Sequence, residues 1–146
     1  MKEILVALDF SGQAEPVLEV AAELARGLGA ELTIVHVAAP DPTFVSLSAG
    51  PQTVRDTRAE ELHEEHDQLR AWAEALTERG IPTKSLLIQG STADAILSEA
   101  ERLEVDLIVV GSHAKGAISR IVLGSVSESV IRSTRCPVLV VPPPEG

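Results

Sequence analysis

Apolar residues gather in five short runs along the chain, and polar or turn-forming residues bound each run. Valine, isoleucine, leucine and alanine fill these runs almost without polar alternation, which is typical of parallel strands buried on both faces. The runs predict strands at residues 3–9, 31–37, 83–88, 105–110 and 136–141.

Between these runs, apolar positions recur three and four residues apart, as they do on one face of an amphipathic helix. The spacing predicts helices at residues 14–28 and 53–79, a helix that opens within 90–94 and reaches Leu103, and a helix within 118–133 that is formed at least from Ser125. Residues 38–52 contain three prolines and a glycine, which predicts a long mobile loop.

The alternation of strand and helix predicts an α/β fold with right-handed crossovers. We expect one doubly wound domain, residues 1–146, with a five-stranded parallel sheet in the order 3-2-1-4-5 and helices on both faces. In that order the winding reverses between strands one and four, where such sheets bind ligands beyond their carboxyl ends. Asp9 and Gly111 would then face each other across one crevice.

The stretch from Leu107 to Glu128 has the features of a phosphate-binding cradle. A buried strand turns at Gly111 into a short polar loop, and Gly124 leads into Ser125-Val-Ser-Glu128. That tetrapeptide has the pattern of a capping box, in which the serine and the glutamate each accept from the other's backbone amide. A helix N-terminus preceded by glycine offers amides and a positive dipole end to an anion.

The composition supports a packed domain with an aliphatic core, because 45% of the 146 residues are hydrophobic and only 2% are aromatic. The net charge of −10 argues against nucleic acid and anionic membranes as partners. Cys136 is the only cysteine, which excludes an intramolecular disulfide. The chain shows no signal-peptide pattern and no apolar run of membrane length, so we expect a soluble cytoplasmic protein.

The chain lacks the defining motifs of several classes of protein that bind nucleotides or phosphate. It has neither the G-x-x-x-x-G-K-[ST] of P-loop proteins nor a G-x-G-x-x-G after the first strand. The third strand ends without the aspartate of a phospho-accepting receiver domain, and aromatic residues to stack on a flavin are almost absent.

Taken together, four segments resemble the universal stress protein family along the whole chain. They are Ile4-Leu-Val-Ala-Leu-Asp-Phe-Ser11, Gly90-Ser-Thr-Ala-Asp-Ala-Ile96, the stretch from Gly111 to Val126, and Cys136-Pro-Val-Leu-Val-Val141. The resemblance implies a single universal stress protein domain with the fold of the adenine nucleotide alpha-hydrolases. It also implies that ATP, or ADP or AMP, is held with Mg or Mn in a stress-response or regulatory role, with slow hydrolysis at most.

The family's nucleotide-binding members carry G-x2-G-x9-G-[ST] at this cradle, and this chain departs from the motif at one position. Gly111 matches the first glycine and Gly124-Ser125 match the last pair, whereas Ala114 replaces the middle glycine. Alanine adds a methyl group and disfavours positive φ where the backbone would approach the phosphates. Gly116, two residues later, can supply the lost flexibility.

From the crevice and the resemblance together we expect a set of nucleotide-binding residues, in which Asp9 also holds the metal ion. The resemblance implies that Val35 and Val37 line the adenine pocket through their backbone. The expected set is Ala7, Asp9, Val35, Val37, Gly111, Ser112, His113, Lys115, Gly116, Gly124, Ser125, Val126 and Ser127.

Six of these residues also have a structural interpretation. Asp9 can be a helix cap or a surface carboxylate, and Ser125 a cap alone. His113 and Lys115 can be solvated loop residues, and the two valines plain core.

Elsewhere, His63 and His66 lie one turn apart among glutamates, where a solvated acidic face is a better interpretation than a metal site. Cys136 is expected to be a buried, unreactive thiol. Because no catalytic triad, metal-ligand set or carboxylate pair stands out, a nucleotide-binding regulatory protein is favoured over an enzyme. Two alternatives stay open: a nucleotide-free dimeric interaction module, favoured by Ala114, and a weak ATPase, favoured by Asp9 beside the phosphates.

The last strand, from Pro137 to Val141, predicts a homodimer. It is short and apolar, and in the expected order it lies at the sheet edge, where unpaired amides and carbonyls recruit another strand. Two copies related by a twofold axis would pair antiparallel with Leu139 near the axis. The resemblance implies the same arrangement.

Overall fold

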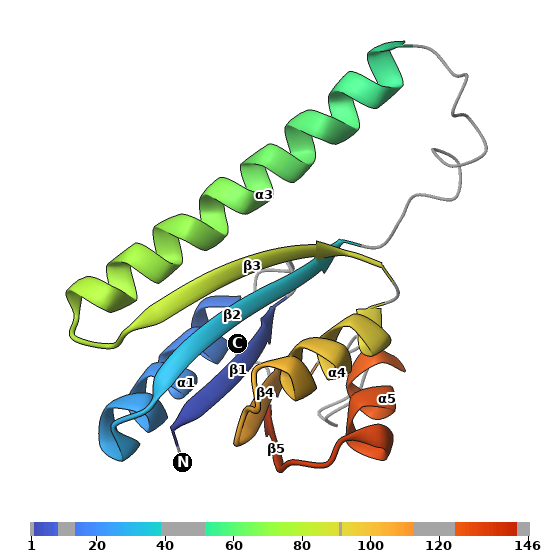
Figure 1. The fold of residues 1–146 in the computed structure, drawn as a ribbon. Coiled ribbons are helices and arrows are strands. Elements are labelled where there is room, and N and C mark those ends of the chain that lie inside the picture. The colour runs from blue at the N-terminus through green and yellow to red at the C-terminus, as the bar shows by residue number, and fades with distance from the viewer. Residues whose placement is uncertain (1, 9–13, 39–51, 91, 113–124, 143–146) are drawn as a thin grey trace, which may run out of the picture.

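The computed structural model describes residues 2–8, 14–38, 52–90, 92–112 and 125–142, in which helices pack on both sides of a central sheet (Figure 1). Strands and helices alternate as the apolar pattern predicts. In chain order they are β1 (Glu3–Leu8), α1 (Ala14–Leu28), β2 (Glu31–Ala38), α3 (Gln52–Glu78), β3 (Thr83–Gln89), α4 (Thr92–Arg102), β4 (Leu107–Gly111), α5 (Ser125–Ser133) and β5 (Val138–Val141).

The sheet has five strands in the order β3-β2-β1-β4-β5, and every neighbouring pair is parallel. This confirms the predicted fold, including the reversal of winding between β1 and β4. The predicted element boundaries differ from the observed ones by one or two residues. The largest differences are at β4 and β5, which each begin two residues later than predicted. The predicted loop 38–52 lies mostly outside the described residues, and its end residues belong to β2 and α3.

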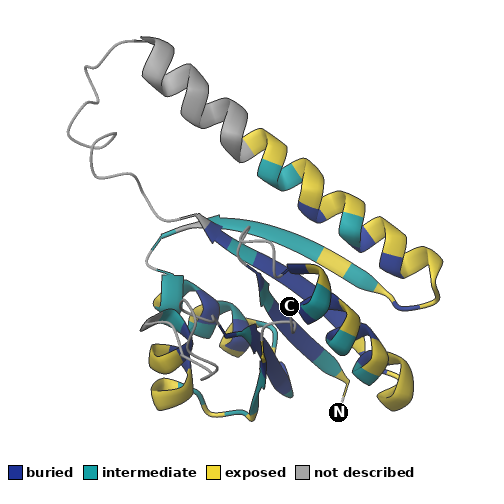
Figure 2. Cartoon of the chain, turned by 180° about the vertical axis from the view of Figure 1, so that it is seen from behind, coloured by how far each residue is buried: buried dark blue, intermediate teal, exposed yellow. Residues whose placement is uncertain are grey.

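The apolar runs lack polar alternation because both faces of the sheet are covered. Ile4, Val6 and Leu8 of β1 pack on the face that α1 and α3 cover. Leu5 and Ala7 pack on the opposite face with α4 and α5. In Figure 2 the central strands are accordingly coloured as buried, and the helices are exposed on their outward sides.

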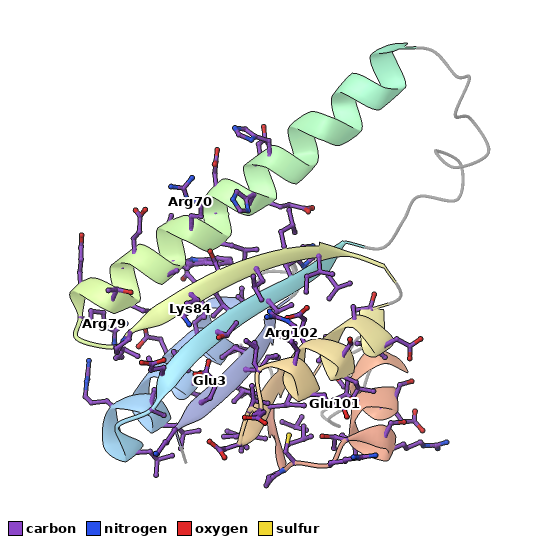
Figure 3. The ribbon with its side chains drawn as sticks, in the orientation of Figure 1. Glu3, Arg70, Arg79, Lys84, Glu101 and Arg102 are labelled. Atoms are coloured by element: carbon purple, nitrogen blue, oxygen red, sulfur yellow. The ribbon has the colours of Figure 1, made fainter. Side chains whose placement is uncertain are left out.

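The long helix α3 packs on the sheet through its C-terminal half. Leu69, Ala73 and Leu76 are spaced four and three residues apart, which places them on one buried stripe. Arg79, just beyond the helix, donates to Glu19 of α1 at 2.9 Å and joins the two helices of this face (Figure 3). Since that pair is exposed, we expect the apolar stripe rather than the ion pair to hold α3 in place.

A carboxylate fixes the starts of β1 and β4 relative to each other. Asp106 Oδ2 accepts from the backbone N–H groups of Lys2 at 2.7 Å and Glu3 at 3.1 Å. These two donors hold the pKa of the Asp106 carboxyl below its usual value. The N–H of Asp106 in turn donates to the Glu3 carbonyl at 2.8 Å. The two strands that flank the reversal of winding are therefore locked together at their amino ends.

Within the described ranges, no helix combines the length and the apolar character that a membrane crossing requires.

Candidate functional site

The carboxyl ends of β1 and β4 lie side by side, as the predicted site requires. The register pairs Ala7 of β1 with Val110 of β4 on one side and with Val35 of β2 on the other. Because all five strands are parallel, Leu8 and Gly111 end at the same edge of the sheet. A ligand placed beyond this edge would meet the residues that follow both strands.

Two serines of the predicted site fasten the cradle to the sheet. Ser127, in the first turn of α5, donates from Oγ to the Gly111 carbonyl at 3.3 Å. Ser112 donates to the Val141 carbonyl twice, from its backbone N–H at 2.9 Å and from Oγ at 3.2 Å. The start of α5 is therefore tied to the end of β4, and the residue after β4 is tied to the end of β5.

These bonds determine what the two serines can offer a ligand. Ser112 is fully buried and Ser127 is 8% exposed. Both donors of Ser112 are used within the protein, which gives it an anchoring role in this structure. Gly111 is half-buried at the last position of β4, where its pairing partner is Val141.

Four of the predicted residues share one side of the sheet. Ala7, Val35 and Val37 point into the cluster that α4 and α5 cover, and Val126 of α5 packs against the same cluster. The structure thus brings the expected adenine-pocket valines to the side on which α5 begins. Val35 and Val37 are buried, so their interpretation as plain core also stands.

The centre of the predicted cradle lies outside the described residues. This applies to Asp9, His113, Lys115, Gly116 and Gly124, to Ala114, and to the Ser125 side chain. The predicted bond from the Glu128 amide to the Ser125 side chain therefore lies outside the described residues as well. The Glu128 carboxylate accepts from Arg132, one turn further along α5, at 2.6 Å.

Within the part of the chain that the structure describes, no three His, Cys, Asp or Glu side chains gather closely enough to hold a metal ion. His63 is 76% exposed and lies 3.6 Å from Asp67 on the outer face of α3, which fits the solvated interpretation. The metal role of Asp9 stays a prediction.

His36, which belongs to none of the predicted motifs, occupies the same edge of the sheet. Its Nδ1 lies 3.0 Å from the Leu8 carbonyl oxygen, and its Nε2 lies 3.5 Å from Glu65 Oε2 of α3. The signal that points to it is a lone histidine inside an otherwise apolar strand, Glu31-Leu-Thr-Ile-Val-His-Val37.

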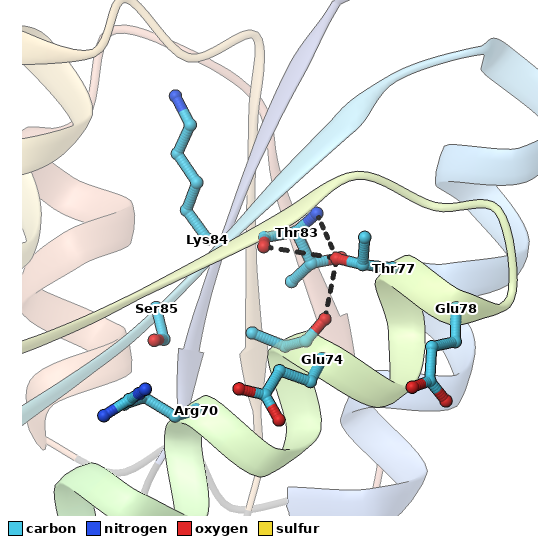
Figure 4. Close-up of a pocket in the computed structure, with 8 residues that line it drawn as sticks. Arg70, Glu74, Thr77, Glu78, Thr83, Lys84 and Ser85 are labelled. Carbon is cyan, nitrogen blue, oxygen red and sulfur yellow. Dashed lines mark hydrogen bonds between the residues drawn. The ribbon is translucent and has the colours of Figure 1, made fainter.

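The described surface also has two hollows that lie away from this edge. The first hollow, of about 430 Å³, lies between α3 and the start of β3, and residues of both charge signs line it (Figure 4). Lys84 points away from Arg70 and from the carboxylates of α3, so its charge is not directed at that hollow. The other, of about 300 Å³, includes Cys136, which is half-buried rather than buried as predicted.

Comparisons of the sequence and of the fold with known proteins agree on the family to which this chain is similar. The model of the universal stress protein family matches residues 1–142. A universal stress protein of Thermus aquaticus is 38% identical over 141 residues, covering 96% of this chain and 98% of the relative.

Two solved structures resemble this one closely. The structure of hypothetical protein MJ0577 has a TM-score of 0.79 and 29% identity, covering 99% of this chain and 98% of its own. The structure of the universal stress protein from Archaeoglobus fulgidus in complex with dAMP has a TM-score of 0.69 and 25% identity, covering 97% and 98%. The family model matches almost the whole of this chain, and the Thermus aquaticus relative aligns with it nearly end to end. The chain therefore belongs to the universal stress protein family.

Proposed function

We propose that this protein binds ATP, or ADP or AMP, beyond the carboxyl ends of β1 and β4 and serves a regulatory role in a stress response. One observation carries the proposal: α5 begins beside the junction of these two strands, held there by the bond from Ser127 to Gly111. A helix N-terminus at the reversal point of a parallel sheet is a favourable place for phosphate groups.

The base and the phosphates would contact different parts of this edge. Backbone N–H groups around Gly124 and Ser125 would donate to the phosphates, and Lys115 and His113 would add positive charge. Asp9 would take the ribose hydroxyls or a Mg or Mn ion that accompanies the nucleotide. The backbone of Val35 and Val37 would contact the adenine, on the side of the sheet where both valines lie.

A relative supports the choice of adenine nucleotides as the ligand class. The Archaeoglobus fulgidus universal stress protein has been solved in complex with dAMP, and its fold superposes on this one over nearly the whole chain. Adenine and a phosphate are common to dAMP and to the three nucleotides proposed here. The triphosphate is favoured because the cradle offers glycine-flanked backbone at both Gly111 and Gly124.

A nucleotide-free interaction module is the competing function. Ala114 stands at the middle glycine position, and both donors of Ser112 are already bound to Val141. In that case the chain would act only through protein contacts. A weak ATPase is the third possibility, which requires Asp9 to lie beside the phosphates.

We expect ATP with magnesium to raise the melting temperature of the protein. A ligand that binds only the native state at 100 times its Kd adds about 2.7 kcal/mol to the free energy of unfolding. For a chain of this size that corresponds to roughly 6–10 °C. Differential scanning fluorimetry with ATP, ADP and AMP measures the shift, and mass spectrometry of nucleotides released from the purified protein identifies the natural ligand. An unchanged melt with all three would favour the nucleotide-free module.

Restoring the motif with Ala114→Gly is expected to tighten ATP binding. Glycine removes the methyl group and allows positive φ, which costs a non-glycine residue roughly 1–2 kcal/mol, or about 5- to 30-fold in Kd. Isothermal titration calorimetry of the variant beside the parent protein measures it. Unchanged or weaker binding would show that the loop has adapted to alanine, and Gly116→Ala in both backgrounds would test whether that glycine supplies the flexibility.

We also propose a homodimer through β5. The two edges of the sheet are β3 and β5, and they differ in character. β3 begins Thr83-Lys-Ser85 with an exposed lysine, which protects an edge against pairing, whereas β5 is Val138-Leu-Val-Val141 with its first three residues only half-buried. The uncharged, half-buried edge is the better candidate for strand pairing between two copies.

A further inference from the structure

We propose that His36 is a positioning residue for the nucleotide pocket, linking α3 to the ends of β1 and β2, the two strands that carry the pocket residues Ala7, Val35 and Val37. The inference rests on the proposed function above. It concerns a residue that is not expected to touch the nucleotide, because it lies on the opposite face of the sheet.

The ring of His36 spans the point where the pairing of β1 with β2 ends. Their register runs from Glu3 and Glu31 to the last pair, Leu8 and His36. At this last pair Nδ1 lies 3.0 Å from the Leu8 carbonyl oxygen. A side chain on β2 therefore adds a bond to the final residue of β1, where the backbone ladder stops.

The chemistry of the carbonyl assigns the proton on the ring. A carbonyl oxygen only accepts, so Nδ1 must carry a hydrogen for this contact to be a hydrogen bond. Nε2 is then directed at Glu65 Oε2, 3.5 Å away. That oxygen is buried and has no hydrogen-bond partner among the described residues. A carboxylate oxygen accepts and does not donate, so this contact is a hydrogen bond only with a hydrogen on Nε2.

Glu65 connects this ring to the packed part of α3. It lies one turn before Leu69, which is fully buried against the sheet. The side chains of His36 and Glu65 are 14% and 25% exposed, so solvent only partly screens their contact. The pairing neighbour of His36 on β3 is Leu87, which is uncharged. Glu65 is a charged residue that the structure places against the ring.

The strand backbone carries this restraint to the other face. Val35 and Val37 flank His36 in the chain, and Ala7 precedes Leu8. Successive side chains in a strand point to opposite faces, so a ring that fixes His36 and Leu8 from the α3 side also fixes the three pocket residues on the α5 side. A shift of the strand ends would displace the backbone groups expected to contact adenine.

The test compares variants of His36 by calorimetric titration with ATP. His36→Phe keeps the ring shape but removes both nitrogens, whereas His36→Asn keeps a donor near the position of Nδ1. We expect ATP binding to weaken about 3- to 10-fold in the phenylalanine variant, as for loss of one hydrogen bond. The asparagine variant should recover most of the affinity, and Glu65→Gln should lose about 2-fold. His63→Phe on the exposed face of α3 is the matched control and should bind as the parent does.

Two measurements on the nucleotide-free protein separate this inference from the proposed function. The ¹⁵N chemical shifts of the His36 ring should show a protonated Nδ1. The backbone chemical shifts of Ala7, Val35 and Val37 should move in His36→Phe and return in His36→Asn. If the parent binds no adenine nucleotide, the proposed function fails, and these shifts alone decide whether His36 positions the strand ends. An unprotonated Nδ1, or a folded His36→Phe with unchanged pocket shifts and affinity, would overturn the inference.

Discussion

Replacing Gly124 with valine is expected to abolish nucleotide binding while leaving the fold intact. Gly124 directly precedes Ser125, the first residue of α5, whose first turn is tied to the end of β4. Phosphates bound at this N-terminus need close approach to the backbone, which a branched side chain would obstruct. Losing two charge-assisted hydrogen bonds, each worth about 1.5–3 kcal/mol, corresponds to a drop in affinity of more than about 100-fold.

Gly27→Val in α1 is the matched control for this variant. Space around a side chain at Gly27 is open, and this helix lies on the opposite face of the sheet from α5. The control should therefore bind ATP with the parent affinity. Calorimetry gives the Kd values, and circular dichroism melts check that both variants are folded. A folded Gly124→Val that still binds ATP as the parent does would place the nucleotide elsewhere.

Replacing Leu139 with lysine is expected to convert the homodimer into a monomer. Leu139 is the central apolar residue of the β5 edge, and antiparallel pairing about a twofold axis would bring the two copies of it together. Two ammonium groups placed there would repel each other and would lose water on pairing. Light scattering at micromolar concentration should give twice the chain mass of 15.4 kDa for the parent and the single mass for the variant.

Leu139 also packs against the core beneath α1 and α3, so lysine at this position disturbs the core as well as the edge. Two further variants therefore test the dimer independently. Ser85→Lys places the same charge on the opposite edge, β3, and should stay dimeric. A Leu139→Cys variant in a Cys136→Ser background should form a disulfide-linked dimer under mild oxidation. A monomeric parent protein, or a folded Leu139→Lys that remains a dimer, would contradict pairing through β5.

The strands and helices could be predicted because their signals are local. The run Ile4-Leu-Val-Ala-Leu8 is apolar at every position, which only a strand covered on both faces explains. The strand order is not encoded in any one run. It was inferred from the general behaviour of doubly wound sheets, and the family resemblance agrees with it. The observed order shows that this inference was right.

The candidate site was predictable only in outline. Glycines and serines at characteristic spacing pointed to a cradle near Gly111 and Gly124. Glycine allows the tight turns and the close approach of backbone to ligand that such a cradle requires. The roles of individual side chains were harder to predict. Ser112 was expected to face the nucleotide, and in the structure both of its donors bind the end of β5.

The strand and helix segments, the cover on both faces of the sheet and the glycine-flanked turns at Gly111 and Gly124 were all predictable from local sequence patterns. The contacts between side chains that are distant in the sequence became visible only in the folded protein. His36 meets Leu8 and Glu65, and Asp106 meets the amides of Lys2 and Glu3. The physical reason is that periodicity arises from one residue's neighbours along the chain. Strand register and helix placement arise from many weak packing contacts acting together, and no local pattern encodes their sum.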